Sequence, residues 1–448
     1  MMRYFKKFPI YSFSFFVFLF LFLNLFYNQL MIKLGYSYPR TSFFFRPSDI
    51  FGDFFNLIIN QHDLSDYFIV LHGVKDYTLL KKYLYNDFYH QNNFVVPPFY
   101  GFIAGINAVF FKLVSPYLVY FLNIFLFLII FFFQIKKFLI DKKVSLIIFI
   151  SSIFSYVILF MINRGHIYSA FLSLVLIQII INCYLKKNFI QNFFFVLFAV
   201  SGKIAALCFA LYIFNYKISF KKKLLTFSIL LCSSPIFFLL FNEFNYFFLD
   251  NAWSFFNNFE NTLKMHTQKN YYNIYIIGDG GLSFGSSLWG PVKILIRNLF
   301  NNYNYNTWLL ITFFICSLIF FLFTLFFFLK KIASPLFLYA LVSYYILASP
   351  VSADYHLIVF FGPLLLLLKD YDNSNNKFLY SILILAIAII VSPQHFYLFN
   401  DTKPEKTILN PLIIIITNIY ILIHINFSFK NVFNFFFRLL TRQNRAKH

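Results

Sequence analysis

The chain is made largely of apolar segments long enough to cross a membrane. A transmembrane helix needs about 20 consecutive apolar residues. Segments that approach or exceed this length are residues 8–33, 116–135, 144–162, 167–185, 224–248, 306–329, 333–349, 355–369, 378–393 and 409–427. Only 12% of the residues are charged, whereas the charged share of a soluble domain is about 25%. The sequence therefore predicts an all-α polytopic membrane protein.

Two further apolar pieces contain polar interruptions. Residues 97–114 include Lys112, while residues 189–216 are broken around Gly202 and Lys203. Discontinuous helices are tolerated in a membrane where they line a cavity and do not face lipid. We therefore expect residues 189–216 to form two short helices that meet near one membrane face. We expect about 10 to 13 spans in total, short or broken helices included.

Long polar loops divide the series of spans. We expect a single membrane-embedded domain over residues 1–448. Its parts are a first span (8–33), an outer loop (36–96), core spans (97–248), a second outer loop (249–305), C-terminal spans (306–427) and a basic tail (428–448). The first segment is too long for a signal peptide and has no small-residue cleavage site, so we expect an uncleaved span.

The basic residues predict how the spans are oriented. The formal net charge is +21, and the basic residues cluster in short runs between apolar segments, as cytoplasmic orientation signals do. With both termini in the cytoplasm, the inner runs are Lys136, Lys137, Lys142 and Lys143; Lys186 and Lys187; Lys217 and Lys221 to Lys223; Lys330 and Lys331; Lys369 and Lys377; and the tail from Lys430. We therefore expect a multi-pass protein of a bacterial inner membrane, with no nucleic-acid partner.

Carboxylates are concentrated in the outer loop 36–96, which holds six of the 16 acidic residues. Asp49 and Asp53 are four residues apart, which would place both on one face of a helix. Like charges this close suit one of the two groups to accept a proton, as a catalytic base does. The alternative is that Ser48 or Asp49 caps a short helix at the membrane interface.

Basic side chains occur at two unusual places on the same predicted face. Arg164 and His166 form a short polar turn between two spans, where an arginine can hold a phosphate through paired hydrogen bonds. The alternative is that they reach toward lipid head groups. Lys203 interrupts an apolar run, and an ionisable residue in such a place is a candidate functional group. We interpret it most simply as an anion-binding residue.

Two further polar connections carry candidate residues. Residues 349–356 join two spans, and His356 could orient or protonate an oxygen atom there, or simply lie at the interface. Residues 279–287 are rich in glycine but lack the Lys-Ser/Thr end of a P-loop, so a loop lying over a substrate is favoured over a nucleotide site. The candidate substrate-contacting residues in these connections are Asp279, Ser283, Ser352 and Tyr355.

Several kinds of chemistry have no support in the sequence. No HExxH, paired CxxC or GxSxG motif occurs, so zinc hydrolysis and serine-hydrolase chemistry are not expected. The four cysteines lie in apolar stretches without metal-ligand spacing, which is typical of small core residues. We expect no cofactor; a divalent cation on the outer carboxylates is the alternative left open.

These positions, taken in order, resemble glycosyltransferase family 87, a branch of the GT-C superfamily of polytopic enzymes. The resemblance is carried by Asp49, by the Val96-Pro97-Pro98-Phe99 entry to an apolar segment, by Arg164-Gly165-His166, by Gly202-Lys203, and by Ser349-Pro350-Val351-Ser352 with Tyr355-His356. It extends from about residue 49 to residue 369 and implies a GT-C-type helix bundle. Asp354 stands where an aromatic or polar residue is more usual in the family.

The resemblance implies transfer of a sugar, typically mannose, from a polyprenyl-phosphate donor to a glycolipid or glycan acceptor on the extracytoplasmic face, with inversion. Asp49, or else Asp53, would deprotonate the acceptor hydroxyl. The residues expected to bind the donor phosphate are Arg164, His166, Lys203 and His356. Two alternatives stay open: an O-antigen-type polymerase or ligase, which would not need the loop carboxylates, and a lipid or solute transporter without chemistry.

Overall fold

The computed structural model is a bundle of helices. It describes residues 8–37, 40–41, 54, 97–111, 113–139, 141–216, 219–249, 285–299, 307, 310–312, 314–319, 334–349, 353–374, 376–392, 396–397 and 406–424. The α-helices are α2 (Phe8–Lys33), α7 (Pro98–Phe111), α8 (Pro116–Phe138), α9 (Lys142–Ile153), α10 (Tyr156–Arg164), α11 (Ile167–Leu185), α12 (Phe189–Gly202), α13 (Phe220–Leu249), α16 (Trp289–Leu299), α18 (Ser334–Leu347), α19 (Phe361–Asp370), α20 (Lys377–Val391) and α21 (Lys406–His424). Two 3₁₀ helices, η2 (Ile204–Asn215) and η5 (Asp354–Phe360), accompany them.

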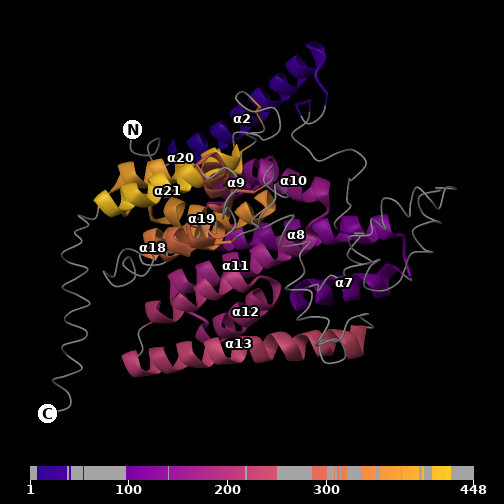
Figure 1. The fold of residues 1–448 in the computed structure, drawn as a ribbon, viewed down its shortest axis with the longest axis vertical. Helices are drawn as coiled ribbons and strands as arrows, with labels where there is room; N and C mark the ends of the chain where they lie inside the picture. The colour runs from indigo at the N-terminus through magenta and orange to yellow at the C-terminus, as the bar shows by residue number, and fades with distance from the viewer. Residues whose placement is uncertain are drawn as a thin grey trace.

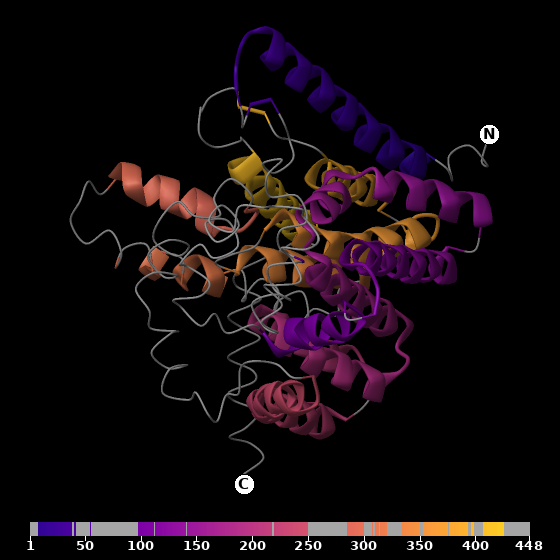
Figure 2. The same ribbon diagram turned by 90° about the vertical axis from the view of Figure 1, so that its right-hand side faces the viewer.

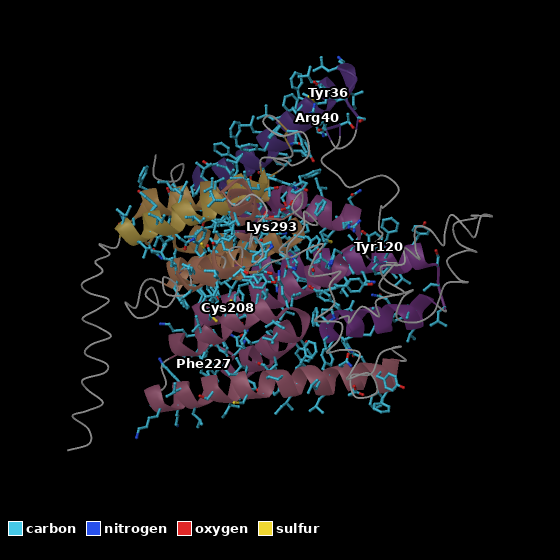
Figure 3. The ribbon with its side chains drawn as sticks, in the orientation of Figure 1. Tyr36, Arg40, Tyr120, Cys208, Phe227 and Lys293 are labelled. Carbon is cyan, nitrogen blue, oxygen red and sulfur yellow. The ribbon has the colours of Figure 1, made fainter. Side chains whose placement is uncertain are left out.

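The helices lie side by side in a stack, with α2 at one edge and α13 at the other (Figure 1). The view turned by 90° shows α2 crossing the end of the stack obliquely (Figure 2). Tyr36 and Arg40 lie together beyond α2, away from the rest of the bundle (Figure 3), with the guanidinium carbon 4.5 Å from the ring centre. No strand occurs among the described residues, so the predicted all-α architecture is confirmed for that part of the chain.

Five helices in the described part of the chain are long and apolar enough to cross a membrane: α2, α8, α11, α13 and α21. The pair α9 and α10 makes a sixth candidate if it is counted as one span. The helices α7, α12, α18 and α20 are apolar but shorter. The chain can therefore cross a membrane several times, and the expected total of about 10 to 13 spans stays a prediction.

The segment expected as one span at 144–162 is bent. Helices α9 and α10 meet at an angle of 52°. Ser151 and Ser152 each donate a hydrogen bond to the carbonyl four residues earlier, and Ser155 donates to the carbonyl of Ser152. Serine hydroxyls that bond back to the preceding turn compete with the helical ladder and bend helices, so this serine group explains the break.

Helix α11 lies at the centre of the bundle, and 78% of its span is buried within the protein. It packs against α7, α8, α12, α19 and η5. The contact with α19 is close, because a Cβ atom added at Gly362 would lie 2.7 Å from Cδ1 of Ile180. Small residues at helix contacts let two backbones approach in this way.

Residues 189–216 form a helical hairpin. Helix α12 ends at Gly202, Lys203 is extended with φ −157° and ψ 115°, and η2 begins directly afterwards. The open end of the hairpin closes through Tyr216, whose ring packs on Phe189 at 5.1 Å and whose hydroxyl donates to the Lys187 carbonyl at 2.6 Å. The prediction of two short helices that meet at this lysine is confirmed.

Lysine-bearing helix ends meet on one side of the bundle. The last turn of α8 includes Lys136 and Lys137. The neighbouring Phe138 ring lies 5.5 Å from the ring of Tyr184, near the end of α11. The ammonium group of Lys369, in the last turn of α19, lies over both rings at 4.2 and 5.5 Å. The ends of α8, α11 and α19 therefore form one basic end of the bundle.

We expect Gly362→Ala to lower the stability of the folded protein. The new methyl group would overlap Cδ1 of Ile180, and overpacking of a well-packed core costs about 1–3 kcal/mol. Thermal unfolding in detergent measures the effect. Ile180→Val removes the overlapping atom, so the double variant should regain part of the loss. An unchanged unfolding temperature in Gly362→Ala would contradict the close contact.

Candidate functional site

The opposite end of the bundle gathers polar and aromatic side chains. The first turns of α7 and α11 meet there, because the hydroxyls of Tyr100 and Ser169 are hydrogen-bonded at 3.0 Å. The Tyr100 ring lies 5.8 Å from the ring of His166, the residue that precedes α11. Gly202, at the turn of the hairpin, packs close to Phe99 and to α11. The turn of the hairpin thus reaches the beginnings of α7 and α11.

The turn at Gly165 determines where His166 lies. Gly165 has φ +78°, in the left-handed region where glycine is not strained, and its N–H donates to the Met161 carbonyl at 2.9 Å. This αL ending closes α10 and lets the chain reverse into α11. The His166 ring then stacks on the ring of Tyr355 with centres 4.1 Å apart. A glycine between two polar residues therefore brings α10, α11 and η5 together.

The hydrogen bonding of His166 indicates which of its nitrogens carries the proton. The N–H of Ser169 donates to Nδ1 at 3.4 Å, so Nδ1 is the acceptor of a neutral ring and Nε2 is the donor. Burial lowers the pKa of His166 to about 3, and the positive charges of Arg164 and Lys203 act in the same direction. His166 is therefore a neutral hydrogen-bond donor at pH 7.

Lys203 extends from the turn of the hairpin into this group. Its ammonium nitrogen is buried, has no hydrogen-bond partner among the described residues, and lies 5.1 Å from the ring centre of Tyr345. A buried ammonium group that lacks an acceptor is unfavourable unless an anion accompanies it. The predicted role of Lys203 as an anion-binding residue is compatible with this position.

His356 lies in the same electrostatic environment. It is 7% exposed, and it interacts electrostatically with Lys203 and His166. Its Nδ1 lies 3.2 Å from the carbonyl of Ala353, and a carbonyl oxygen only accepts, so Nδ1 is the donor. Nε2 is then the nitrogen left for a ligand.

The structure thus brings together five of the sequence-predicted residues. They are Arg164, His166, Lys203, Tyr355 and His356. Five others, Asp49, Asp53, Asp279, Ser283 and Ser352, lie outside the described residues. No group of three or more His, Cys, Asp or Glu side chains that could hold a metal occurs in the described part. The arrangement can therefore be assessed for anion binding, while the choice of base stays a prediction.

One described residue links the first outer loop to this site. Phe54, which directly follows Asp53 in the sequence, is fully buried. Its carbonyl accepts a hydrogen bond from the hydroxyl of Tyr168 at 2.9 Å. Its ring lies 5.0 Å from that of Tyr120, near the beginning of α8 (Figure 3). Phe54, one residue of the loop that carries the candidate bases, is therefore held to Tyr168, two residues after His166.

Sequence reasoning missed a buried ion pair beside the site. Lys406, at the beginning of α21, pairs with Asp354, and the two side chains are 1% and 0% exposed. Asp354 directly precedes Tyr355 and His356. The available signal was a single carboxylate between apolar segments, which needs a buried partner of opposite charge. The sequence alone did not indicate which lysine supplies it.

We expect His166 to make part of the stability depend on pH. A histidine in the unfolded chain has a pKa of about 6.5, so between that value and the folded pKa of about 3 the unfolded state binds the extra proton. Stability is then fully present above about pH 6.5 and is lost as the pH falls. The unfolding temperature of His166→Asn should decrease less than that of the wild type between about pH 7.5 and 4.5.

The exposed His424 at the end of α21 provides the control for this measurement. His424→Asn should show the wild-type decrease, because it leaves the buried histidine in place. A decrease in His166→Asn equal to that of the wild type would contradict the assignment of a neutral, buried His166.

The described side of the site combines a buried ammonium group, a neutral histidine donor and a second histidine with several tyrosine rings. Such a set of donors in an apolar environment suits an oxyanion attached to a larger, partly apolar molecule. No family model, curated protein or solved structure matches this chain.

Proposed function

We propose that this protein is an integral-membrane glycosyltransferase. It transfers a sugar, mannose being the first choice, from a polyprenyl-phosphate carrier to a lipid-linked or glycan-linked acceptor on the extracytoplasmic face. The observation that carries the proposal is the convergence of Lys203, His166 and His356 at one end of the bundle. We further place the chain in the GT-C type of helix bundle, with about 10 to 13 spans.

The convergence supports the binding of a phosphate group. The buried Lys203 nitrogen supplies a positive charge once an anion binds beside it, and the Nε2 proton of His166 supplies a neutral donor near it. Hydrogen bonds from a charged donor to phosphate are short and strong, and they are stronger still where water is excluded. The apolar helices around the site are compatible with a lipid tail on the same ligand.

The two ends of the bundle support the proposed side of the membrane. The lysines at the ends of α8 and α19 lie together at the end far from His166. Under the positive-inside rule, a lysine-rich end faces the cytoplasm. The end that holds Lys203 and His356 then faces outward, where a lipid-linked donor is used without a nucleotide.

The proposed reaction is a single displacement. The acceptor hydroxyl oxygen forms a bond to the anomeric carbon as the bond between that carbon and the phosphate oxygen breaks. The electron pair stays on the polyprenyl phosphate, whose growing charge is stabilised by the donor-binding residues Lys203, Arg164, His166 and His356. The hydroxyl proton passes to Asp49 or Asp53. Attack from the face opposite to the leaving group inverts the anomeric centre.

The attachment at Phe54 supports a base in the first outer loop. The Phe54 ring packs on Tyr168 and Tyr120, and the Tyr168 ring lies 6.2 Å from His166. Asp53 is joined directly to Phe54 in the sequence, so it is the loop carboxylate nearest along the chain to this contact. We therefore propose that the base comes from this loop.

Sugar transfer by the purified protein tests the proposal. Polyprenyl-phosphate-linked mannose, glucose and arabinose are each supplied with a mixed glycolipid acceptor pool. We expect a glycosylated product from at least one donor, and none from the variant that removes the base, Asp49→Asn or Asp53→Asn. Full activity in both variants would rule out a carboxylate base at these positions. No product with any donor would favour the polymerase, ligase or transporter alternatives.

We expect Lys203→Met to reduce kcat/KM by about 100-fold, because removing one electrostatic donor to a developing oxyanion has roughly that effect. The matched control is Lys369→Met at the opposite end of the bundle. Both lysines lie over a tyrosine ring, at 5.1 Å from Tyr345 and 5.5 Å from Tyr184. The control should keep most of the activity. Equal losses in the two variants would indicate a general effect on folding.

A further inference from the structure

We propose that Lys406 is a positioning residue for the phosphate-binding site. Through its buried ion pair with Asp354 it fixes the segment that carries Tyr355 and His356, and so directs Nε2 of His356 toward the ligand. This inference rests on the proposed function for the identity of the ligand. It adds a residue from α21, which lies outside the range over which the sequence resembles a known family.

The ion pair is the centre of a buried polar network. The Lys406 ammonium group donates to Asp354 Oδ2 and to the Tyr156 hydroxyl, the latter at 2.6 Å. Asp354 Oδ1 accepts from the Ser286 hydroxyl at 2.7 Å, and the Asn410 amide donates to that same hydroxyl oxygen at 3.1 Å. The network therefore joins α10, the segment just before α16, η5 and α21.

The network is connected directly to the site through the backbone of η5. Gly285 forms a bridge with Ala353, and the Ala353 carbonyl accepts both the His356 N–H at 2.9 Å and its Nδ1 at 3.2 Å. Asp354 lies between these two residues. Any shift of Asp354 would therefore move the carbonyl that orients the His356 ring.

The same network also borders the stacked rings of the site. The Lys406 nitrogen lies 4.3 Å from the ring centre of Tyr156 and 5.7 Å from that of Phe160. Phe160 stacks on Tyr355 at 6.2 Å, and Tyr355 stacks on His166 at 4.1 Å. The Lys406 ammonium group therefore lies over the rings of Tyr156 and Phe160, and the row of rings continues from Phe160 through Tyr355 to His166.

A buried ion pair is a poor source of stability, because removing two charges from water offsets most of their attraction. Buried pairs can instead specify one arrangement of the chain. Here the pair, together with the Ser286 and Asn410 hydrogen bonds, selects one position of η5 relative to α21. A site built from His166 and His356 requires a single position for the segment that carries His356, because the direction of its ring depends on that segment.

The test separates position from folding by neutralising both partners at once. The double variant Asp354→Asn with Lys406→Met leaves no unpaired buried charge, so it should fold, which thermal unfolding in detergent checks. We measure equilibrium binding of undecaprenyl phosphate, a probe that does not require turnover. We expect the affinity of the double variant to fall by at least about tenfold, the size of one lost charged hydrogen bond. Lys406→Arg, which keeps the pair, should bind as the wild type does.

Ser286→Ala provides a second variant that alters no charge. It removes one hydrogen bond to Asp354, and we expect a smaller loss of affinity in the same direction. Wild-type affinity in both the double variant and Ser286→Ala would overturn the positioning role, even if both are less stable. Failure of the wild type to bind undecaprenyl phosphate would instead contradict the proposed function.

Discussion

The burial of α11 determines where polar chemistry can occur in this protein. With 78% of its span covered by other helices, it contacts neighbours on nearly every side, and backbone groups there must be satisfied within the helix. Chain reversals and charged side chains are therefore confined to its two ends. The His166 end carries the candidate site, and the end at Tyr184 meets the lysines. The candidate site and the lysines that signal orientation therefore lie at opposite ends of this one helix.

Much of the fold could be predicted from the sequence, because the length and charge of apolar segments are local properties. The hairpin at 189–216 was predictable, since Ser201, Gly202 and Lys203 interrupt a long apolar run. The convergence of Arg164, His166, Lys203 and His356 was predictable for a related reason, because each lies at a segment end assigned to the same face. The 52° bend between α9 and α10 was missed, because serines in an apolar run are compatible with a straight span as well.

The pairing of Asp354 with Lys406 could not be predicted, because it depends on which helix ends become neighbours in three dimensions. The same is true of the aromatic rings that surround the site. Tyr100, Tyr168 and Tyr345 resemble many other tyrosines in a chain that has 32 of them, and only packing distinguishes the tyrosines that lie beside His166 or Lys203. Asp354 differs from the aromatic or polar residue that is more usual at this position of the family. The ion pair with Lys406 gives that difference a physical reason. A carboxylate next to a cationic site is tolerated because a separate lysine neutralises it.

The position of α2 has a consequence for biosynthesis. It packs against α20, Phe13 meets Phe361 edge to face at 6.4 Å, and the Tyr27 hydroxyl accepts a hydrogen bond from the N–H of Tyr397, 370 residues later, at 3.1 Å. At about 5–20 residues per second, the ribosome reaches Tyr397 on the order of half a minute after it has synthesised α2. During this interval the face of α2 that α20 will cover must be shielded by lipid or by the insertion machinery. A nascent chain released early would present that face to the quality-control proteases of the membrane.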